Sequence, residues 1–161
     1  MRERVWEPSS RSARPSSRAA RGERPLIHEI RLRVRYSETD AQRVVNNANY
    51  LSYFEVGRVE WLRAAGFSYR EMEKMGYGFV VTEAHAYYKR PAFFDDELTL
   101  CTELVEKKRV SLSFGYTVLR DEEVIVTGRT RHGCVDLASG RPSRIPEELV
   151  VHVSARGSES A

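Results

Sequence analysis

Apolar and polar residues alternate strictly from residue 28 to residue 35, directly behind a polar N-terminal segment. The apolar positions are Ile30, Leu32 and Val34, and the charged ones are Glu29, Arg31, Arg33 and Arg35. A period of two is typical of a β-strand with one face buried and the other in solvent. The pattern therefore predicts a strand here that packs its apolar side against a core.

Further along the chain the period lengthens to about 3.6 residues, as in a helix. The recurring positions are Tyr50, Phe54, Gly57 and Trp61, with Tyr53 and Leu62 widening the stripe. This spacing predicts one long helix from Asn47 to Ala65 whose stripe lies in the core. Asn46 or Asn47 is expected to cap its start, because a short amide side chain accepts hydrogen bonds from unpaired N–H groups. Gly66 is expected to end it.

A second, shorter helix is predicted next, because Ser68 and Glu71 have the spacing of a capping box and Gly76 follows. Behind it come four strand patterns separated by short turns. They run from Phe79 to Lys89, across Leu98, Leu100 and Leu104, from Val110 to Val118, and from Glu123 to Asp136. The order β-α-β-β-β-β predicts an α+β domain, a curved antiparallel sheet wrapped around one long central helix.

The chain has 161 residues and a formal net charge of +3, which is unevenly distributed. Residues 1–25 contain seven arginines and three glutamates, so this segment carries +4 and the rest of the chain carries −1. The basic character therefore gives no support for a nucleic-acid-binding domain. Because the segment is rich in Arg, Ser, Ala and Pro, we expect a disordered tail at 1–25, one folded domain at 26–153 and a second disordered tail at 154–161.

Several familiar kinds of site are absent from the sequence. It contains no Gly-rich phosphate loop and no GxSxG or HExxH motif. Cys101 and Cys134 have no Cys or His partner at metal-ligand spacing, and no apolar run approaches the roughly 20 residues of a membrane-spanning helix. We therefore expect a cytoplasmic protein without metal or redox cofactor, without stable membrane insertion and without a nucleic-acid partner. His85 and His132 are only minor candidates for catalysis.

The strongest indication of function lies in the segment YSETDAQRVVNNANYLSYFEVGRVEWL. Asp40–Tyr50, followed by Tyr53–Arg58, resembles the signature of the hotdog-fold acyl-CoA thioesterases. The resemblance is greatest to the 4-hydroxybenzoyl-CoA thioesterase group, including its Tol-Pal-associated acyl-CoA members. Tyr88–Asp96 and Cys134–Glu147 resemble the strand-end and final-strand segments of the same family. The resemblance covers roughly residues 28–150 and implies the hotdog fold, in the element order predicted above.

The resemblance also implies a mechanism. Asp40 would attack the thioester carbonyl or activate a water molecule, and the backbone N–H of Asn47 would bind the oxyanion at the start of the helix. Substrate contacts are expected from Val45, Tyr50, Arg43, Lys89 and Arg90, the cations because the carrier bears phosphates. The competing interpretation of Asp40 is a turn residue that caps its own loop.

Two positions depart from the family pattern. Many relatives have a glycine where Arg43 stands, and arginine does not easily adopt the positive φ that glycine allows. Asn47 stands where many relatives carry His or Tyr, and an amide does not titrate. Two alternatives therefore stay open, the same reaction on acyl-ACP and a hotdog module that binds an acyl thioester without hydrolysing it. Relatives pair their sheets, so we expect a homodimer or homotetramer with acyl-CoA as substrate.

Overall fold

The computed structural model describes residues 26–154, so the predicted tail at 1–25 and all of the predicted C-terminal tail except Ser154 lie outside the described residues. The elements are β1 (Ile27–Arg33), the 3₁₀ helix η1 (Tyr36–Glu38), α1 (Asn49–Ala64), α2 (Tyr69–Lys74), β2 (Tyr77–Tyr88), β3 (Glu97–Lys107), β4 (Ser111–Arg120), β5 (Glu123–Asp136) and α3 (Glu147–Ser154). The predicted order β-α-β-β-β-β is confirmed, as is the second short helix.

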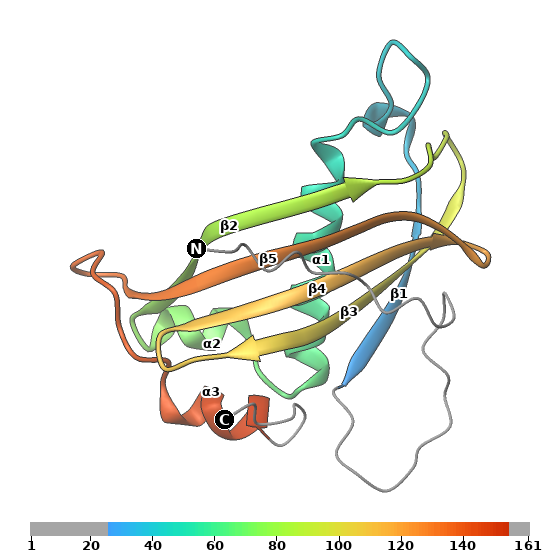
Figure 1. Ribbon diagram of the computed structural model, residues 1–161. Helices are drawn as coiled ribbons and strands as arrows, with labels where there is room; N and C mark the ends of the chain where they lie inside the picture. Colours follow the sequence, from blue (N-terminus) through green and yellow to red (C-terminus); the bar gives the residue numbers. More distant parts are fainter. Residues whose placement is uncertain (1–25, 155–161) are drawn as a thin grey trace, which may run out of the picture.

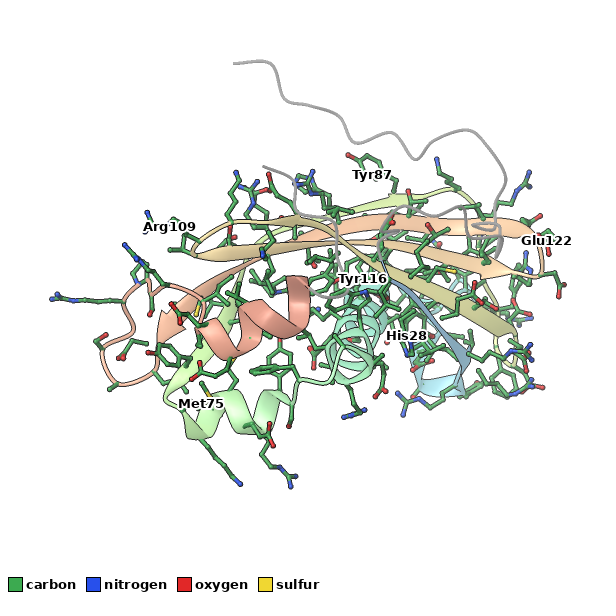
Figure 2. The ribbon with its side chains drawn as sticks, turned by 90° about the horizontal axis from the view of Figure 1, so that it is seen from below. His28, Met75, Tyr87, Arg109, Tyr116 and Glu122 are labelled. Atoms are coloured by element: carbon green, nitrogen blue, oxygen red, sulfur yellow. The ribbon has the colours of Figure 1, made fainter. Side chains whose placement is uncertain are left out.

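The five strands form one antiparallel sheet with the order β1-β3-β4-β5-β2. All three α-helices lie on the same face of this sheet (Figures 1 and 2). The chain moves from one edge of the sheet to the other between β1 and β2, and α1 crosses the face on the way. It contacts β1, β2, β3 and β4. The predicted α+β architecture, a curved sheet around one long helix, is confirmed.

The apolar stripe of α1 fills the space beneath the sheet (Figure 2). Its buried members are Tyr50, Tyr53, Phe54, Gly57, Trp61 and Leu62. Phe54 stacks on Tyr116 with 4.3 Å between ring centroids. This approach requires a glycine on the neighbouring strand, because a Cβ on Gly128 would lie 2.4 Å from the Phe54 ring. The predicted core face of the helix is therefore confirmed, and full burial of one such side chain contributes roughly 1.5–3 kcal/mol.

The predicted end of α1 is confirmed, whereas the predicted cap of α2 is wrong. Gly66 has a φ of 91°, and the N–H of Phe67 donates to the Leu62 carbonyl, as in a Schellman motif. α2 begins directly after Ser68, but the Ser68 side chain makes no capping hydrogen bond, so the capping box with Glu71 does not form. A helix of six residues is stabilised mainly by its packing, here through the buried Met72, and not by its cap.

α3 is not among the elements expected from the sequence. It begins after Pro146, whose carbonyl accepts hydrogen bonds from the N–H groups of Leu149 and Val150. Leu149 is fully buried and Ile145 nearly so, which explains why the segment packs onto the core as a helix. A proline followed by two glutamates is an ordinary helix start, so the signal was present in the sequence. No helix in the described range is long and apolar enough to cross a membrane.

A chain of polar groups lies inside the core beneath β4 and β5. The Tyr116 hydroxyl is 2.6 Å from Thr130 Oγ1, which in turn is 2.7 Å from His132 Nε2. Burial, together with the positive charge of the buried Arg58, lowers the pKa of His132 to about 4, so the imidazole is neutral near pH 7. His132 is thus a hydrogen-bonded core residue. Arg58 also lies 3.8 Å from Glu55, but its side chain is buried while that of Glu55 is exposed, so the pair is not an ordinary surface ion pair of the helix.

The buried imidazole makes the free energy of unfolding depend on pH. The unfolded chain binds a proton at His132 near pH 6.5, and the folded chain binds it only near pH 4. Stability is therefore fully present above pH 6.5 and falls as the pH decreases toward 4, by at most about 3 kcal/mol. We expect His132→Gln to lose less stability than the wild type between pH 7 and pH 5, measured by urea unfolding. Equal losses in both proteins would contradict this prediction.

Candidate active site

Asp40 lies in a hairpin loop between η1 and the start of α1. The Arg43 N–H donates to the Asp40 carbonyl at 2.9 Å, and the Asp40 N–H donates to the Val44 carbonyl at 3.0 Å. Thr39 and Val45 form a β-bridge at the base of the loop. This is the pattern of a three-residue hairpin loop in which a type I turn is followed by a bulge. The backbone itself therefore fixes the position of Asp40.

The two oxygens of the Asp40 carboxylate have different environments. Oδ1 accepts a hydrogen bond from the Gln42 N–H at 2.8 Å, so the aspartate does cap its own loop. No group among residues 26–150 forms a hydrogen bond or ion pair with Oδ2. One oxygen of this partly exposed residue therefore holds the loop, and the other is not engaged by the described part of the chain.

Arg43 has a φ of 65°, in the left-handed region. This is the bulge position of the loop, where glycine is the usual residue. Arginine does adopt the positive φ here, because the hairpin hydrogen bonds hold it there, at the cost of roughly 1–2 kcal/mol that makes this conformation difficult for a residue other than glycine. The Arg43 side chain is exposed and forms no ion pair with the described part of the chain.

α1 begins at Asn49 with Ala48 as its N-cap, so the predicted start at Asn47 and the predicted asparagine N-cap are both wrong. The chain enters the helix through a turn that starts at Asn46. The Asn46 carbonyl accepts from the Asn49 N–H at 2.9 Å, and Asn46 Oδ1 accepts from the Ala48 N–H at 2.9 Å. Asparagine favours this short-range bond to the backbone two residues ahead, which delays the first α-helical hydrogen bond.

Asn47 lies at the centre of this turn and carries an unused donor. Its N–H donates to no group among the described residues, whereas its carbonyl accepts from the Tyr88 hydroxyl at 3.0 Å. The peptide unit that carries the free N–H is fixed at its other end, because the Asn46 carbonyl accepts a hydrogen bond from the Asn49 N–H. The start of a helix also carries a partial positive charge. The site therefore holds one fixed donor that an anion could use.

Val45 and Tyr50, both predicted as substrate contacts, are only 2% exposed and belong to the hydrophobic core. Burial, and next to it the neighbouring Tyr88, raises the pKa of Tyr50 to about 12. The ring of Tyr50 meets that of Tyr88 edge-on at 5.7 Å between centroids. Val45 and Tyr50 therefore belong to the core next to the Asp40 loop and the helix start.

Lys89 and Arg90 directly follow β2, and both are exposed. Arg90 Nε lies 3.5 Å from the Glu123 carboxylate, so its charge is partly balanced. The Lys89 side chain forms no ion pair within residues 26–150. Because Tyr88 reaches Asn47, this end of β2 lies beside the helix start, and the structure brings the two cations to the same end of the domain as the loop.

Glu38 connects the loop to the helix, a role that no pattern in the sequence indicates. Its buried carboxylate accepts hydrogen bonds from the Tyr53 hydroxyl at 2.7 Å and from the Arg35 N–H at 2.8 Å, while its carbonyl accepts from the Asn46 N–H at 2.9 Å. Burial alone would raise the pKa of Glu38, but the hydrogen bonds from Arg35 and Tyr53 hold it below its usual value. A buried charge with several donors rigidifies its surroundings.

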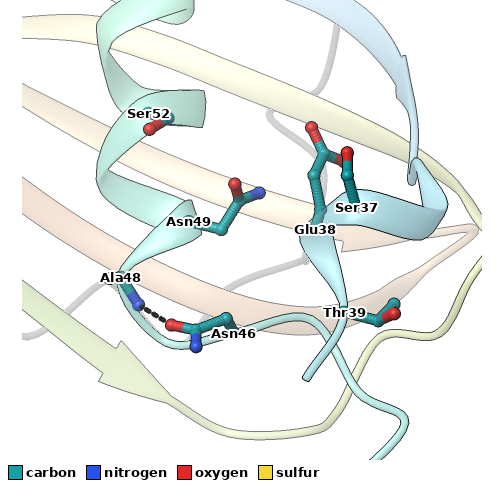
Figure 3. A pocket seen from close by; sticks show the side chains of 7 residues that line it. All are labelled: Ser37, Glu38, Thr39, Asn46, Ala48, Asn49 and Ser52. Carbon is teal, nitrogen blue, oxygen red and sulfur yellow. Dashed lines mark hydrogen bonds between the residues drawn. The ribbon is translucent and has the colours of Figure 1, made fainter. Parts of the chain in front are cut away.

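A polar pocket of about 330 Å³ lies between η1 and the start of α1 (Figure 3). It is lined by Ser37, Glu38, Thr39, Asn46, Ala48, Asn49 and Ser52. Neither Asp40 nor Asn47 lines it, although the chain neighbours of both do. Among the described residues, no group of three or more His, Cys, Asp or Glu side chains could hold a metal ion.

Comparisons with known proteins place this geometry in context. The sequence model of the Thioesterase-like superfamily matches residues 34–153. The acyl-CoA thioesterase YbgC of Haemophilus influenzae is 34% identical over 119 residues, which cover 73% of this chain and 88% of that protein. A crystal structure of a protein from Aquifex aeolicus has a TM-score of 0.75 and 35% identity, covering 79% of this chain and 99% of its own. The DHNA-CoA thioesterase from Staphylococcus aureus has a TM-score of 0.75 and 28% identity, covering 80% and 91%.

The conformation of Arg43 leads to a stability prediction. Arg43→Gly should be at least as stable as the wild type, because relief of roughly 1–2 kcal/mol of strain exceeds the about 0.5–1 kcal/mol that glycine's freedom costs on folding. Arg43→Val should be less stable by roughly 1 kcal/mol or more, since a β-branched residue fits a positive φ poorly. Urea unfolding of the three proteins measures both effects. A valine variant as stable as the glycine variant would contradict the prediction.

Proposed function

Because the chain belongs to the thioesterase-like superfamily, we propose that it hydrolyses acyl-CoA thioesters, with Asp40 as the reacting carboxylate and the Asn47 N–H as the oxyanion donor. The observation that carries the proposal is the pair of unused groups on one loop–helix connection, Asp40 Oδ2 and the Asn47 N–H. The first can act as a base or nucleophile and the second as a donor to negative charge. The Haemophilus influenzae relative is named an acyl-CoA thioesterase, which supports acyl-CoA as the substrate.

The proposed reaction breaks the bond between the acyl carbon and the thiol sulfur. Asp40 Oδ2 either attacks the carbonyl carbon directly or takes a proton from the water molecule that does. The carbonyl oxygen becomes an oxyanion and accepts a hydrogen bond from the Asn47 N–H. When the carbonyl re-forms, the thiolate leaves and is protonated. After direct attack, water then cleaves the acyl–aspartyl anhydride. Turnover in isotopically labelled water would place label in Asp40 only along the route of direct attack, when water attacks the aspartyl carbon of the anhydride.

The free cations at this end of the domain favour a phosphorylated carrier. Arg43 and Lys89 are exposed and form no ion pair with the described residues, whereas Arg90 is shared with Glu123. Coenzyme A carries phosphates that such side chains bind, lysine as a point charge and arginine through its planar fork. We propose that Arg43 and Lys89 contact these phosphates and that Arg90 contributes less. Val45 and Tyr50 would support the acyl group from behind, as part of the core wall.

We also propose that two copies pair along β2. Among the described strands, β2 is an edge and pairs only with β5. It exposes Val80 and Val81 at 46% and 53%, which an unpaired edge strand seldom does. Antiparallel pairing of the same strand across a twofold axis would bury this edge in both copies. Further pairing into a tetramer, the cytoplasmic location, the domain limits 26–153 and the Tol-Pal association stay predictions.

The decisive variant is Asp40→Asn, which keeps the shape of the side chain and its acceptor for the Gln42 N–H but removes the base. We expect release of free thiol from acyl-CoA to fall at least ~100-fold. The matched control is Asp121→Asn, an exposed aspartate of the β4–β5 turn whose positive φ of 53° asparagine tolerates as well. It should keep wild-type turnover across short, long and aromatic acyl-CoAs.

Other outcomes of this assay would replace parts of the proposal. Wild-type turnover by Asp40→Asn would show that another group reacts. A wild-type protein that binds acyl-CoA without hydrolysing it would be a binding module. Turnover of acyl-ACP with none of acyl-CoA would leave the chemistry intact and change the carrier.

The proposed pairing predicts that Val81→Lys shifts the protein toward a monomer, because a buried unpaired lysine at the interface is costly. Sedimentation velocity at several concentrations measures this shift. Val110→Lys is the control, since Val110 is a comparably exposed valine, at 43%, outside β2. Equal association of the two variants would exclude β2 as the interface.

A further inference from the structure

The peptide unit between Asn47 and Ala48 is held at both ends by side chains. Its carbonyl accepts from the Tyr88 hydroxyl at 3.0 Å, and its N–H donates to Asn46 Oδ1 at 2.9 Å. The preceding peptide unit carries the free Asn47 N–H. Because consecutive peptide units share one Cα atom, holding the second unit limits rotation of the first. The direction of the free N–H therefore depends on both bonds.

Among the described residues, the first turn of α1 has only long main-chain hydrogen bonds to hold it, besides the 2.9 Å bond from the Asn49 N–H to the Asn46 carbonyl. The Tyr50 N–H reaches the Asn47 carbonyl only at 3.4 Å, and the Leu51 N–H reaches the Ala48 carbonyl at 3.2 Å. The N-cap Ala48 has no side-chain acceptor to offer. Helix ends of this kind fray, so a bond from outside the helix has a large effect on the order of this turn. Tyr88 supplies such a bond from 41 residues away in the sequence.

Tyr88 is itself well placed to act as a fixed anchor. It is the last residue of β2 and pairs with Val126 of β5. The next two N–H groups of the chain, those of Lys89 and Arg90, both donate to the Ile125 carbonyl. Its ring lies edge-on against that of the buried Tyr50. Although the residue is 49% exposed, its backbone is held by β5 and its ring contacts Tyr50.

We propose that Tyr88 is a positioning residue that orients the Asn47 N–H toward the thioester oxygen. This inference rests on the proposed function, since it assigns the N–H its role in the transition state. Donors in an oxyanion hole are effective because they point in the right direction before the charge develops. Loss of the Tyr88 hydroxyl would leave the donor present but less well ordered. The penalty would therefore fall on the chemical step and not on the binding of the ground state.

Tyr88→Phe tests this, because it removes the hydroxyl and keeps the ring that contacts Tyr50. We expect kcat to fall roughly tenfold, less than for the loss of a whole donor, with KM for the same acyl-CoA changed by about twofold or less. The control is Tyr87→Phe, since Tyr87 is the adjacent residue of β2, similarly exposed at 41%, and points away from the helices (Figure 2). It should keep both kinetic parameters, and both variants should keep the wild-type Tm.

A second pair of variants tests the other end of the same peptide. Asn46→Ala should lower kcat because it frees the Ala48 N–H, and Asn46→Ser should restore it, since serine offers an acceptor of similar reach. Recovery in the serine variant would distinguish positioning from a general loss of structure.

The outcomes separate the inference from the proposed function. Absence of turnover by the wild type on every acyl-CoA would remove the proposed function, and with it the role of Tyr88. If the wild type is active and Asp40→Asn is not, an unchanged kcat in Tyr88→Phe would overturn the positioning role alone. A raised KM with unchanged kcat would overturn it too, because it would show that the hydroxyl contacts the substrate. A kcat loss matched by a large fall in Tm would also count against it.

Discussion

The distance between α1 and the sheet is set by two glycines, and the rest of the structure depends on that distance. Gly57 on the helix and Gly128 on β5 have no side chain where the two layers meet, and any Cβ there would collide with its neighbours. Phe54 can therefore lie flat against Tyr116 in the space that Gly128 leaves. With the helix held this close, its first turn lies within reach of the end of β2. A methyl group at either glycine would push α1 away from the sheet, and the contact between its first turn and the end of β2 would be lost.

The loop–helix connection is ordered by groups from separate parts of the chain. Glu38 brings a buried carboxylate from η1, Tyr53 bonds it from α1, and Tyr88 bonds the Asn47 carbonyl from β2. Each of these bonds crosses between elements, so the connection can be rigid without being regular. Burying a carboxylate is costly unless several donors surround it, and Glu38 has them from Arg35 and Tyr53. The connection is thus held by main-chain hydrogen bonds of the hairpin and by a few bonds between elements, of which those to Glu38 are charge-assisted.

Much of the fold could be predicted from the sequence because its determinants are local and periodic. The strand from Glu123 to Asp136 was predicted to the residue, and the aromatic stripe of α1 was identified as core. The resemblance drawn from the Asp40–Tyr50 motif is confirmed as to family, hotdog fold and enzyme class, thioester hydrolase. Periodicity indicates which side of an element is buried, and the motif indicates the family.

The features that escaped prediction are those decided by distant or competing contacts. Asn46 and Asn47 are equal candidates for the N-cap by residue type. In the folded chain, Asn46 Oδ1 accepts from the Ala48 N–H, and Ala48 itself takes the N-cap position. In the sequence, nothing distinguishes Tyr88 from the other residues of its strand. Its contact with Asn47 exists only in the folded sheet. Arg58 resembles an exposed helical cation by spacing, yet it is buried beside His132. Such contacts depend on the closed fold and leave no periodic trace in the sequence.

In the loop around Asp40, the backbone conformation does not depend on which side chain stands at position 43. Main-chain hydrogen bonds and the Thr39–Val45 bridge hold the loop, so the side chain of Arg43 takes no part in keeping it closed. Any residue that tolerates a left-handed conformation can therefore occupy position 43 without moving the aspartate. Exchange of the basic arginine for glycine or asparagine would give a neutral rim, and exchange for aspartate an acidic one, on an unchanged backbone. Carrier preference in such a protein could drift by single substitutions while the reacting groups stay where they are.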